Sequence, residues 1–387
     1  MRILFLNYEY PPLGGGAGNA TKYLLQEYSK HEDMNADLIT SAVDGDFVET
    51  NIFDRITVFR LPIGKDGKNM QKQSQIDLLR YSFSAYRCIR KRILRGEKYD
   101  IIHAFFSVPC GVLALLLSME FHIPFIVSLR GADVPGYAEK FRWIYKILTP
   151  LIRFVWKKSA RVISNSEGLK QLALISKPDQ EIGVIYNGVD TNFFLPDEGK
   201  RSSKHPTILC ASRLTQRKGL QYAIEGFSRI ADKYPHAKMI IAGGDGDAAK
   251  NLKQQVMTLN LKEKITFSGE YDHAKLLQLQ QSSNIFLFPS LNEGMSNSML
   301  EAMASGLPII MTPTGGAQEL IRNGENGFIV DFRSPESIAQ KLDVLLSDTD
   351  LCIRMGRESR QRAEELNWSS VASEYRKIYK EIIHESN

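Results

Sequence analysis

Two glutamates eight positions apart are the residues of this sequence best suited to binding a sugar. Glu293 follows the apolar run 285–288, and Glu301 lies in the apolar stretch that comes next. The glycine, serine and asparagine between them disfavour one continuous helix, which predicts a loop at Glu293 and a helix starting near 296–298. Carboxylates at these places can accept hydrogen bonds from sugar hydroxyls, and the helix start can face an anion. The alternative is two solvated acids favoured by the helix dipole.

Basic residues follow another predicted strand, at 207–211. Arg213 presents a planar fork of N–H donors and Lys218 a compact ammonium group. Together the two cations could clamp a diphosphate. A basic loop after a strand is common, so this signal is weak on its own.

A glycine-rich loop, PPLGGGAG, follows the first predicted strand and leads into a helical pattern over 19–30. Glycines such as Gly15 and Gly16 let backbone N–H groups approach a phosphate closely at a helix N-terminus. Asn19 and Thr21 stand where a dinucleotide fingerprint needs a third glycine, and no Gly-Lys-Ser/Thr follows to make a P-loop. We therefore predict a phosphate contact here, with a tight turn as the alternative.

Further polar groups lie at predicted strand ends in the N-terminal half. Arg130 and Asp133 follow the strand at 125–129, in the stretch LRGAD. His103 lies in IIHAFF, at the end of the strand 101–104. A histidine at that place is as compatible with a structural role as with acceptor binding.

Strands and helices must hold these residues, and the chain alternates between the two from end to end. The predicted strands are short, apolar and bounded by Gly, Ser, Asn or Pro: 3–7, 101–104, 125–129, 161–165, 183–186, 207–211, 238–242, 265–268, 285–288, 308–311 and 327–330. Such strands separated by helices indicate parallel sheets built from βαβ units. They are too many for one ordinary sheet, so two doubly wound domains are predicted, with ligands at the carboxyl ends of the strands.

Length and composition narrow the class of protein. The 387 residues suggest two or three domains, and 43% hydrophobic with 24% charged residues exclude a disordered chain, a collagen and a coiled coil. Four widely separated cysteines argue against a disulfide scaffold or thiolate zinc site and suit a reducing cytosol. The N-terminus lacks the features of a signal peptide. The longest uncharged stretch, 104–119, is shorter than the roughly 20 residues that span a bilayer.

Positive charge gathers in two segments of the N-terminal half. Residues 80–98 hold seven basic residues and one acid, and residues 140–161 hold seven basic residues and no acid. The second segment also carries five aromatic residues. This mixture suits the anionic surface of a membrane, and the alternative is a solvated basic face over a packed apolar one. Nucleic acid is not among the predicted partners.

Taken together, the motifs resemble those of the retaining glycosyltransferases of family four, which have the GT-B fold. The most specific is EGMSNSMLE running into AMASGLPII, in which seven residues separate the two glutamates. SRLTQRKG, AGGDGD, TPTGGAQEL, NGENGFIV, ISNSEGLK, NGVDTNFF and the loop GGGAG match as well. The resemblance covers nearly the whole chain.

The resemblance implies two Rossmann-like, doubly wound parallel-sheet domains that face a cleft. Residues 1–196 would form the acceptor-binding domain, and residues 207–366 the domain that binds the nucleotide sugar. The polar stretch 197–206 is expected as the linker. An amphipathic helix over 367–387 would cross back onto the N-terminal domain.

The resemblance also implies roles for the candidate residues. Arg213 and Lys218 would neutralise the donor diphosphate, Glu301 would hold the ribose hydroxyls, and Glu293 would bind hydroxyls of the transferred sugar. The nucleotide base is expected near 268–271. No cofactor or metal is expected, because the nucleotide sugar is a co-substrate and the sequence offers no clustered metal ligands.

Backbone groups complete the implied donor site. The N–H groups of Met295, Ser296 and Asn297 would approach the sugar and the phosphate. Gly15 and Gly16 would close on the diphosphate from the other domain. Both contributions follow from the resemblance alone.

One departure from the family pattern concerns the place before Gly-x-Asp, where a histidine commonly contacts the transferred sugar. The stretch SLRGADVPG has Arg130 there. Arginine stays charged and cannot act as a base, but it can bind a donor hydroxyl or an acidic group. Pairing of Arg130 with Asp133 or another acid is the alternative. With Glu293, these two residues are the catalytic candidates.

The function that follows is a retaining, metal-independent transferase acting on a UDP- or GDP-sugar. Its acceptor would be a hydroxyl of a glycan or lipid-linked precursor in surface polysaccharide or lipopolysaccharide biosynthesis. The protein is expected in the cytoplasm, with a peripheral place on the inner face of the membrane. The alternatives are a catalytically silent GT-B homologue acting as a subunit or scaffold, and a GT-B nucleotide-sugar epimerase.

Overall fold

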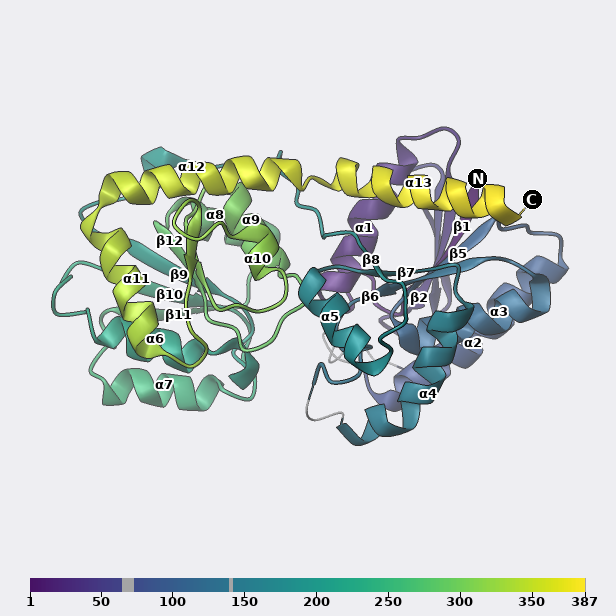
Figure 1. Ribbon diagram of the computed structural model, residues 1–387, viewed down its shortest axis with the longest axis horizontal. Helices are drawn as coiled ribbons and strands as arrows, with labels where there is room; N and C mark the ends of the chain where they lie inside the picture. Colours follow the sequence, from purple (N-terminus) through teal and green to yellow (C-terminus); the bar gives the residue numbers. More distant parts are fainter. Residues whose placement is uncertain (65–72, 139–141, 387) are drawn as a thin grey trace. The chain divides into compact units, whose positions relative to one another are not determined.

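The computed structural model describes residues 1–64, 73–138 and 142–386. These residues form two compact units: the first holds residues 1–187 with the C-terminal segment from Trp368, and the second holds Gly188–Asn367. Figure 1 shows each unit as a twisted sheet covered by helices. Each unit is therefore an α/β domain with its own core.

Strands and helices alternate along the first unit. Its strands are β1 (Arg2–Leu6), β2 (Asn35–Ser41), β3 (Val48–Ile52), β4 (Ile56–Leu61), β5 (Ile101–Phe105), β6 (Phe125–Leu129), β7 (Arg161–Ser164) and β8 (Gly183–Val184). Its helices are α1 (Gly16–Ser29), α2 (Gln75–Leu94), α3 (Val112–Phe121), α4 (Arg142–Lys158), α5 (Glu167–Ser176) and α13 (Trp368–Ser386). A short turn of π-helix, η1 (Ser107–Gly111), joins β5 to α3.

One sheet organises the first unit. The strands described there pair in the order β3-β4-β2-β1-β5-β6-β7-β8, and only the pair of β3 and β4 is antiparallel. Apolar side chains of α2, α3, α4 and α5 form the core on one face of the sheet, while α1 and α13 cover the other face (Figure 1). The central, parallel strands of the sheet are thus buried on both faces, as parallel strands usually are.

The C-terminal helix α13 packs on α1 within the first unit. Its residues Trp368, Tyr375 and Tyr379 are buried and recur at helical spacing. The Trp368 ring stacks on Tyr23 with the ring centroids 5.3 Å apart. The amphipathic pattern of this segment therefore has its partner in the N-terminal part of the chain.

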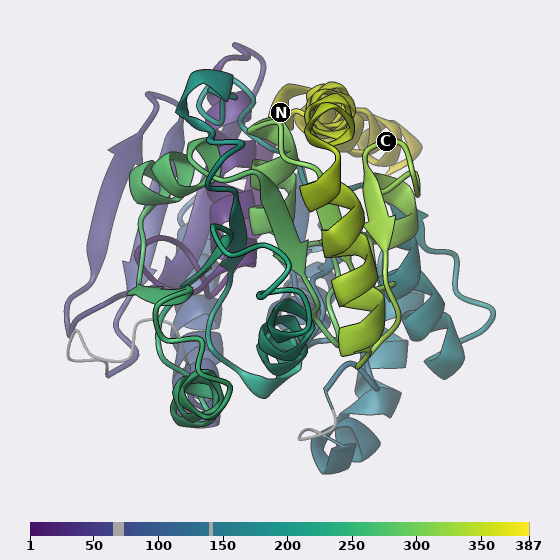
Figure 2. The same ribbon diagram turned by 90° about the vertical axis from the view of Figure 1, so that its left-hand side faces the viewer.

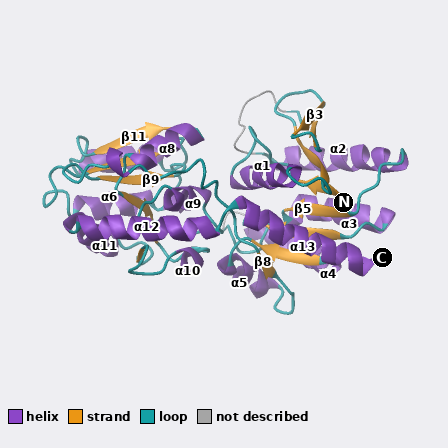
Figure 3. Ribbon diagram, turned by 90° about the horizontal axis from the view of Figure 1, so that it is seen from above, coloured by secondary structure: helices purple, strands orange, loops and turns teal. Residues whose placement is uncertain are grey.

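The strands β2, β3 and β4 are missing from those that the sequence predicts. A buried aspartate, Asp37, interrupts the apolar pattern of β2. Its carboxylate accepts hydrogen bonds from Arg2 at 2.8 Å and from Tyr99 at 2.6 Å, which offset the cost of burying the charge. The largely exposed β3 forms the margin of the sheet, at the end opposite β8 (Figure 3).

The longest uncharged stretch of the chain belongs to several elements. Residues 104–119 run from the end of β5 through η1 into α3, which has 10 residues. Across the residues that the structure describes, no helix combines the length and the apolar character needed to cross a bilayer.

The second unit repeats the alternation of strand and helix. Its strands are β9 (Thr207–Ala211), β10 (Lys238–Ala242), β11 (Ile265–Gly269), β12 (Ile285–Phe288), β13 (Ile309–Met311) and β14 (Gly327–Ile329). Its α-helices are α6 (Leu220–Ser228), α7 (Ala249–Thr258), α8 (His273–Gln281), α9 (Asn297–Ala304), α10 (Ala317–Leu320), α11 (Pro335–Ser347) and α12 (Thr349–Glu365). Short 3₁₀ turns occupy η3 (Glu198–Lys200) and η4 (Gln216–Lys218).

The second sheet is parallel throughout its described strands, in the order β11-β10-β9-β12-β13-β14. Helices lie on both of its sides (Figure 2). The chain builds outward from β9 to β11 and then returns to place β12 on the other side of β9. The strand order therefore reverses between β9 and β12.

The boundary between the two units lies earlier in the chain than the predicted domain boundary. The chain passes from the first unit to the second between Asn187 and Gly188, whereas the sequence predicts the first domain up to 196 and a linker over 197–206. Arg201, inside that predicted linker, donates to the carbonyl oxygen of Gly306 at 2.7 Å. The stretch is polar because it lies on the surface of the second unit, to which side-chain hydrogen bonds fasten it.

Candidate active site

The second unit brings its predicted site residues to the point where its strand order reverses. Residues 212–218 follow β9, and residues 289–296 follow β12. Because β9 and β12 are parallel neighbours, both loops leave the same edge of the sheet. Open α/β sheets bind ligands at this kind of point, outside the carboxyl ends of the strands.

Two basic residues hold Glu293 at this edge. Lys218 Nζ lies 2.6 Å and an Arg217 guanidinium nitrogen 2.8 Å from Oε1 of Glu293. Ser290 donates a hydrogen bond to the same oxygen at 3.1 Å. The side chains of Lys218 and Glu293 are only 12% and 11% exposed, so their ion pair is largely shielded from water. The sequence predicts both residues in the site but does not predict that they contact each other.

The ion pairs control the ionisation of the site. Burial by itself would raise the pKa of Glu293, but Lys218 and Arg217 outweigh this effect and hold the pKa below its usual value. Burial lowers the pKa of Lys218 against the attraction of Glu293, and the charges of Arg217 and Arg213 lower it further. At neutral pH Glu293 is therefore a carboxylate, in contact with Lys218 and Arg217.

Positive charge exceeds negative charge among these four residues. Arg213 is exposed to solvent and lies close enough to Lys218 to lower its pKa. Arg213, Arg217 and Lys218 together bring two guanidinium groups and one ammonium group to the neighbourhood of the Glu293 carboxylate. Such donors form charge-assisted hydrogen bonds to phosphate oxygens. The arrangement can hold a diphosphate beside a carboxylate that accepts from hydroxyl groups.

Glycine allows the two loops to meet at this edge. Gly219 adopts φ +66°, and a Cβ atom built there would lie 2.0 Å from the carbonyl oxygen of Pro289. Any side chain at 219 would therefore push the two loops apart. The N–H of Leu291 also donates to the carbonyl of Arg217 at 2.8 Å. The backbone thereby fixes the basic loop against the loop that carries Glu293.

The loop after β12 ends where α9 begins, at Asn297. Ser296 is the N-cap residue, and its Oγ lies 3.1 Å from the Oγ of Ser298 without capping the helix backbone. Met295 and Ser296 are buried, and the neighbouring glycine loop approaches them, since a Cβ on Gly316 would lie 3.5 Å from the Met295 side chain. The predicted backbone donors Met295, Ser296 and Asn297 thus share the Glu293 loop or the helix start that follows it.

Glu301 lies inside α9 and is 8% exposed. Burial raises its pKa to about 8. His273 Nε2 lies 3.8 Å from a carboxylate oxygen of Glu301, and Glu301 adds to the effect of burial in raising the pKa of Tyr271. The segment predicted to face the base, 268–271, therefore ends beside the predicted ribose ligand. His273 is not among the site residues predicted from the sequence.

Nucleotide binding should depend on pH through Glu301. With a pKa of about 8, its carboxyl group is mostly neutral at pH 7 and mostly ionised at pH 9. Ribose hydroxyls donate to the ionised form, so the affinity for UDP or GDP should rise up to about tenfold over that interval. Calorimetric titrations of the wild type and of Glu301→Gln check this. The variant should bind more weakly with a flat pH profile, and a parallel profile would contradict the ribose assignment.

The first unit places its glycine loop at the carboxyl end of β1. α1 begins at Gly16, and Gly15 is its N-cap residue. The N–H of Gly15 donates to the carboxylate of Glu9 at 3.3 Å, while a Cβ on Gly15 would meet no atom within 4 Å. The backbone is open at this place, but a phosphate at the Gly15 N–H would have to displace the Glu9 carboxylate. Phosphate binding by Gly15 and Gly16 stays a prediction.

His103 lies in a buried hydrogen-bond network. Its side chain is fully buried on β5, with Nδ1 2.7 Å from the Tyr379 hydroxyl and Nε2 2.7 Å from the Ser128 hydroxyl. Burial, assisted by the charge of Arg130, lowers its pKa well below the usual value, so the ring is neutral. Both ring nitrogens have partners within the protein. These contacts favour the structural interpretation that the sequence left open beside acceptor binding.

Arg130 also contacts the C-terminal helix. Its guanidinium group donates to Asn187 at 2.9 Å and to the Tyr375 hydroxyl at 3.4 Å, and its Cζ lies 4.1 Å from the centroid of the Phe105 ring. The alternative of a side-chain ion pair with Asp133 does not occur. Arg130 is therefore fixed by polar and aromatic neighbours.

Asp133 accepts hydrogen bonds from backbone N–H groups and from one hydroxyl. Its carboxylate accepts from the N–H groups of Arg130 at 2.9 Å and Gly131 at 3.0 Å. It also accepts from the N–H and the hydroxyl of Ser107, at 2.8 and 3.0 Å. Burial raises its pKa although these hydrogen bonds oppose the shift. The contacts tie the loop after β6 to η1, and a catalytic role for Asp133 or Arg130 stays a prediction.

Arg217, the second cation that touches Glu293, is not among the site residues predicted from the sequence. One guanidinium nitrogen of Arg217 bonds both the Glu293 carboxylate and the carbonyl of Asn292. The available signal was the adjacent pair Arg217–Lys218 before Gly219. We infer that Arg217 positions Glu293.

Replacing Arg217 by glutamine should lower the turnover of transfer about tenfold, because Glu293 loses one of the contacts that orient it. Affinity for UDP or GDP should change less than about threefold, since Lys218 and Arg213 stay in place. Initial rates and calorimetry measure the two effects. The matched control is Arg229→Gln at the exposed C-cap of α6, which should retain wild-type rates. Equal losses in both variants would contradict the assignment.

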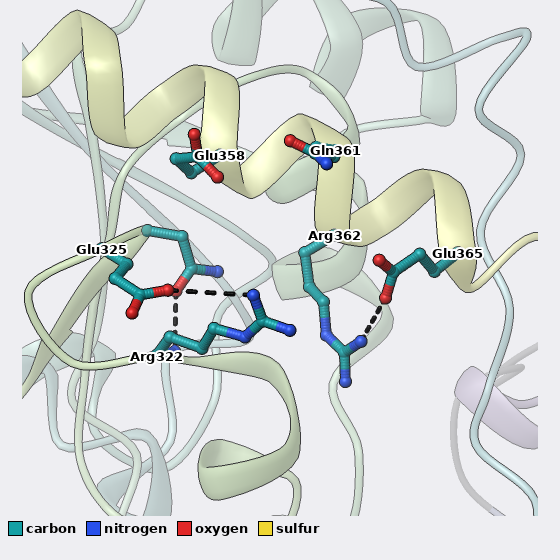
Figure 4. A pocket seen from close by; sticks show the side chains of 7 residues that line it. Arg322, Glu325, Glu358, Gln361, Arg362 and Glu365 are labelled. Carbon is teal, nitrogen blue, oxygen red and sulfur yellow. Dashed lines mark hydrogen bonds and ion pairs between the residues drawn. The ribbon is translucent and has the colours of Figure 1, made fainter.

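A pocket between α12 and residues 322–326 does not belong to this site (Figure 4). Four of its charged side chains form ion pairs, Arg322 with Glu325 at 3.8 Å and Arg362 with Glu365. It lies before β14, at the amino end of the strands. Among the described residues, no three His, Cys, Asp or Glu side chains gather as metal ligands would.

Two family profiles match consecutive parts of this chain. The profile of Glycosyltransferase Family 4 matches residues 14–193, and that of Glycosyl transferases group 1 matches residues 193–362. Together the two profiles cover residues 14–362, which include most of both units. The chain belongs to the glycosyltransferases of family four, and the predicted fold class is confirmed.

Relatives extend the match to almost the full chain. An uncharacterized glycosyltransferase of Methanocaldococcus jannaschii is 28% identical and covers 98% of this chain and 98% of its own length. The N-acetyl-alpha-D-glucosaminyl L-malate synthase of Bacillus anthracis is 26% identical over 76% of this chain and 77% of its own. A crystal structure of Anabaena HepE in complex with UDP-glucose has a TM-score of 0.74 at 19% identity, covering 98% of this chain and 100% of that one. This last likeness shows the fold.

Proposed function

We propose that this protein is a retaining, metal-independent transferase that moves a sugar from a UDP- or GDP-sugar to a hydroxyl group of a glycan or lipid-linked acceptor. The observation that carries the proposal is the shielded Lys218–Glu293 pair at the reversal of strand order, with Arg213 and Arg217 beside it. This group offers cations for a diphosphate and a carboxylate for sugar hydroxyls.

Glycosyl transfer develops positive charge on the sugar ring and negative charge on the departing diphosphate. The bond between the anomeric carbon and the phosphate oxygen breaks, and its electron pair leaves with the phosphate. Arg213 and Lys218 stabilise this negative charge. The acceptor oxygen forms the new bond from the same face, and the leaving phosphate oxygen takes its proton. The anomeric configuration is retained, and no strong protein base is required.

The nucleotide part of the donor has its own support. Glu301 is buried beside Tyr271 and His273, at the carboxyl end of β11. Burial raises the pKa of the Glu301 carboxyl group, and hydrogen bonds from two neighbouring hydroxyls, such as those of ribose, would stabilise its ionised form. The structural relative HepE binds UDP-glucose, which supports a nucleotide sugar as the donor here.

The acceptor belongs to the same proposal. We place it on a glycan or lipid carrier of the kind used in surface polysaccharide or lipopolysaccharide assembly, because basic residues gather at 80–98 and 140–161. An acceptor held on a lipid is met at a membrane surface. The protein would accordingly work in the cytoplasm, on the inner face of the membrane.

The test is a transfer assay with UDP- and GDP-sugars, run in the presence of a chelator. A simple alcohol and a lipid-linked glycan serve as acceptors, and proton NMR reads the anomeric coupling of the product. The proposal expects product with the donor's configuration and rates that the chelator leaves unchanged. Inverted product or a metal requirement would contradict it.

The alternatives give different results in the same assay. A silent homologue would bind the nucleotide sugar but would neither transfer nor hydrolyse it. An epimerase would change the sugar without any acceptor.

A further inference from the structure

Three helices of the first unit present one continuous surface. α3 packs against both α2 and α4, on the face of the sheet opposite α13 (Figure 1). Their inward side chains, among them Tyr81, Leu117 and Trp156, are buried in a single core. Their exposed residues, which we call the α2–α4 face, therefore lie together. The sequence shows only two separate basic segments there.

On α4 the outward stripe of the α2–α4 face is apolar. Trp143 is 74% exposed and Ile147 78% exposed, and Leu151 and Phe154 continue the stripe at helical spacing. Side chains of this size rarely stand in water together unless they meet a partner.

The other two helices of the α2–α4 face continue the apolar surface. On α2, Ile76, Leu79 and Phe83 are between 61% and 71% exposed and share one side of the helix. On α3, Leu116 and Met119 are 49% and 65% exposed. The exposed apolar residues therefore extend across all three helices instead of being scattered singly.

Basic side chains flank the apolar residues. α4 carries Arg142, Lys146, Arg153, Lys157 and Lys158 and no acidic residue. Lys146 Nζ lies 4.4 Å from the centroid of the Trp143 ring. Such lysines lay their aliphatic stems along an apolar surface and keep the ammonium group at its border.

Acidic residues hardly reduce this positive charge. Asp77 and Glu120 are the acids of the three helices. Asp77 accepts from the backbone N–H of Ser74, and Glu120 pairs with Arg90 at 2.7 Å. Arg87 and Lys91 on α2 stay exposed. The α2–α4 face is therefore apolar and cationic at once.

We propose that the α2–α4 face docks on an anionic phospholipid bilayer, with Trp143 and Ile147 inserted at the level of the headgroups and lysines against the lipid phosphates. Apolar and aromatic residues bordered by Lys and Arg are typical of helices that lie in a membrane interface. A protein partner fits less well, because lysine is depleted from protein interfaces. The inference rests on the proposed function only in that docking would bring the enzyme to a lipid-linked acceptor.

Vesicle sedimentation with the full chain tests the docking. Binding to vesicles of phosphatidylcholine with 30% phosphatidylglycerol should exceed binding to pure phosphatidylcholine at least tenfold. The double variant Trp143→Ser, Ile147→Ser and the double variant Lys157→Glu, Lys158→Glu should each lose at least tenfold. Met257→Ser and Lys250→Glu, at exposed positions of α7, are the matched controls and should bind normally.

Tryptophan fluorescence separates insertion from mere adsorption. The chain has three tryptophans, and Trp156 and Trp368 are buried, so Trp143 reports the surface. Its emission should shift to the blue on anionic vesicles and be quenched by lipids brominated near the headgroup. Binding without either change overturns the insertion.

The outcomes distinguish this inference from the proposed function. A chain that binds UDP or GDP but no vesicles overturns the docking and leaves the transferase proposal standing. A chain that binds vesicles through Trp143 but binds no nucleotide overturns the transferase proposal and leaves the docking standing. The bilayer is overturned as the partner if the wild type is a dimer that binds no vesicles and the Trp143→Ser, Ile147→Ser variant is a monomer.

Discussion

Replacing Glu293 by glutamine should lower the turnover of sugar transfer about a hundredfold or more. Glutamine keeps the size of the side chain but removes the charge that Lys218 and Arg217 hold in place. The sugar hydroxyls would then lose a charge-assisted acceptor where positive charge develops on the ring. Steady-state rates with a saturating nucleotide sugar measure the effect, and calorimetry with free UDP or GDP accompanies them.

Two comparisons make the Glu293 result specific. Affinity for the free nucleotide should stay within about threefold, because Glu293 is assigned to the sugar and not to the diphosphate. Glu263→Gln, at an exposed acid of the same unit, should have wild-type activity. If Glu293→Gln transferred sugar at a near-normal rate, the assigned role would be wrong.

Replacing Lys218 by alanine should lower kcat/KM about a hundredfold or more, and it should also weaken binding of UDP or GDP. The ammonium group is assigned to the diphosphate, which is present in the free nucleotide as well as in the transition state. Folding should survive, because Arg217 and Ser290 still contact the Glu293 carboxylate. Thermal unfolding of the variant checks this point.

The Lys218 experiment has its own control and limit. Lys250→Ala removes an exposed lysine of the same unit and should change neither rate nor affinity. The loss of transition-state stabilisation in the double variant of Lys218 and Glu293 should be smaller than the sum of the losses in the two single variants, because the two side chains touch. Full additivity would show that the pair does not act as a unit.

The sequence was informative where chemistry follows directly from strand ends. Lys218 and Glu293 lie in loops after two strands that the sequence predicts, and parallel neighbours must deliver such loops to one edge. The contact between the two side chains depends on the direction in which the 3₁₀ turn Gln216–Lys218 points the lysine. The spacing of residues in the sequence does not reveal that direction. Arg217 was missed for the same reason.

Other features depended on contacts between distant segments. The sequence predicts His103 at the end of a strand, but it lies in the middle of β5. Its environment is set by Ser128 on β6 and Tyr379 on α13, far away in the sequence. Tyrosines at 375 and 379 on a helical pattern were the available signal. β2 escaped prediction because its apolar run contains Asp37, whose partners Arg2 and Tyr99 lie elsewhere in the chain. The predicted linker, 197–206, lies beyond the boundary between Asn187 and Gly188. This polar stretch on the surface of the second unit has the composition of a linker.

The most direct test of the donor site is a calorimetric titration of the chelator-treated protein with UDP and with GDP. We expect tight binding of one nucleotide and weak or no binding of the other, with affinity reduced in Lys218→Ala and Glu301→Gln. Binding of neither nucleotide by the folded protein would contradict the account, because the cations at the edge of the second sheet would then hold no donor.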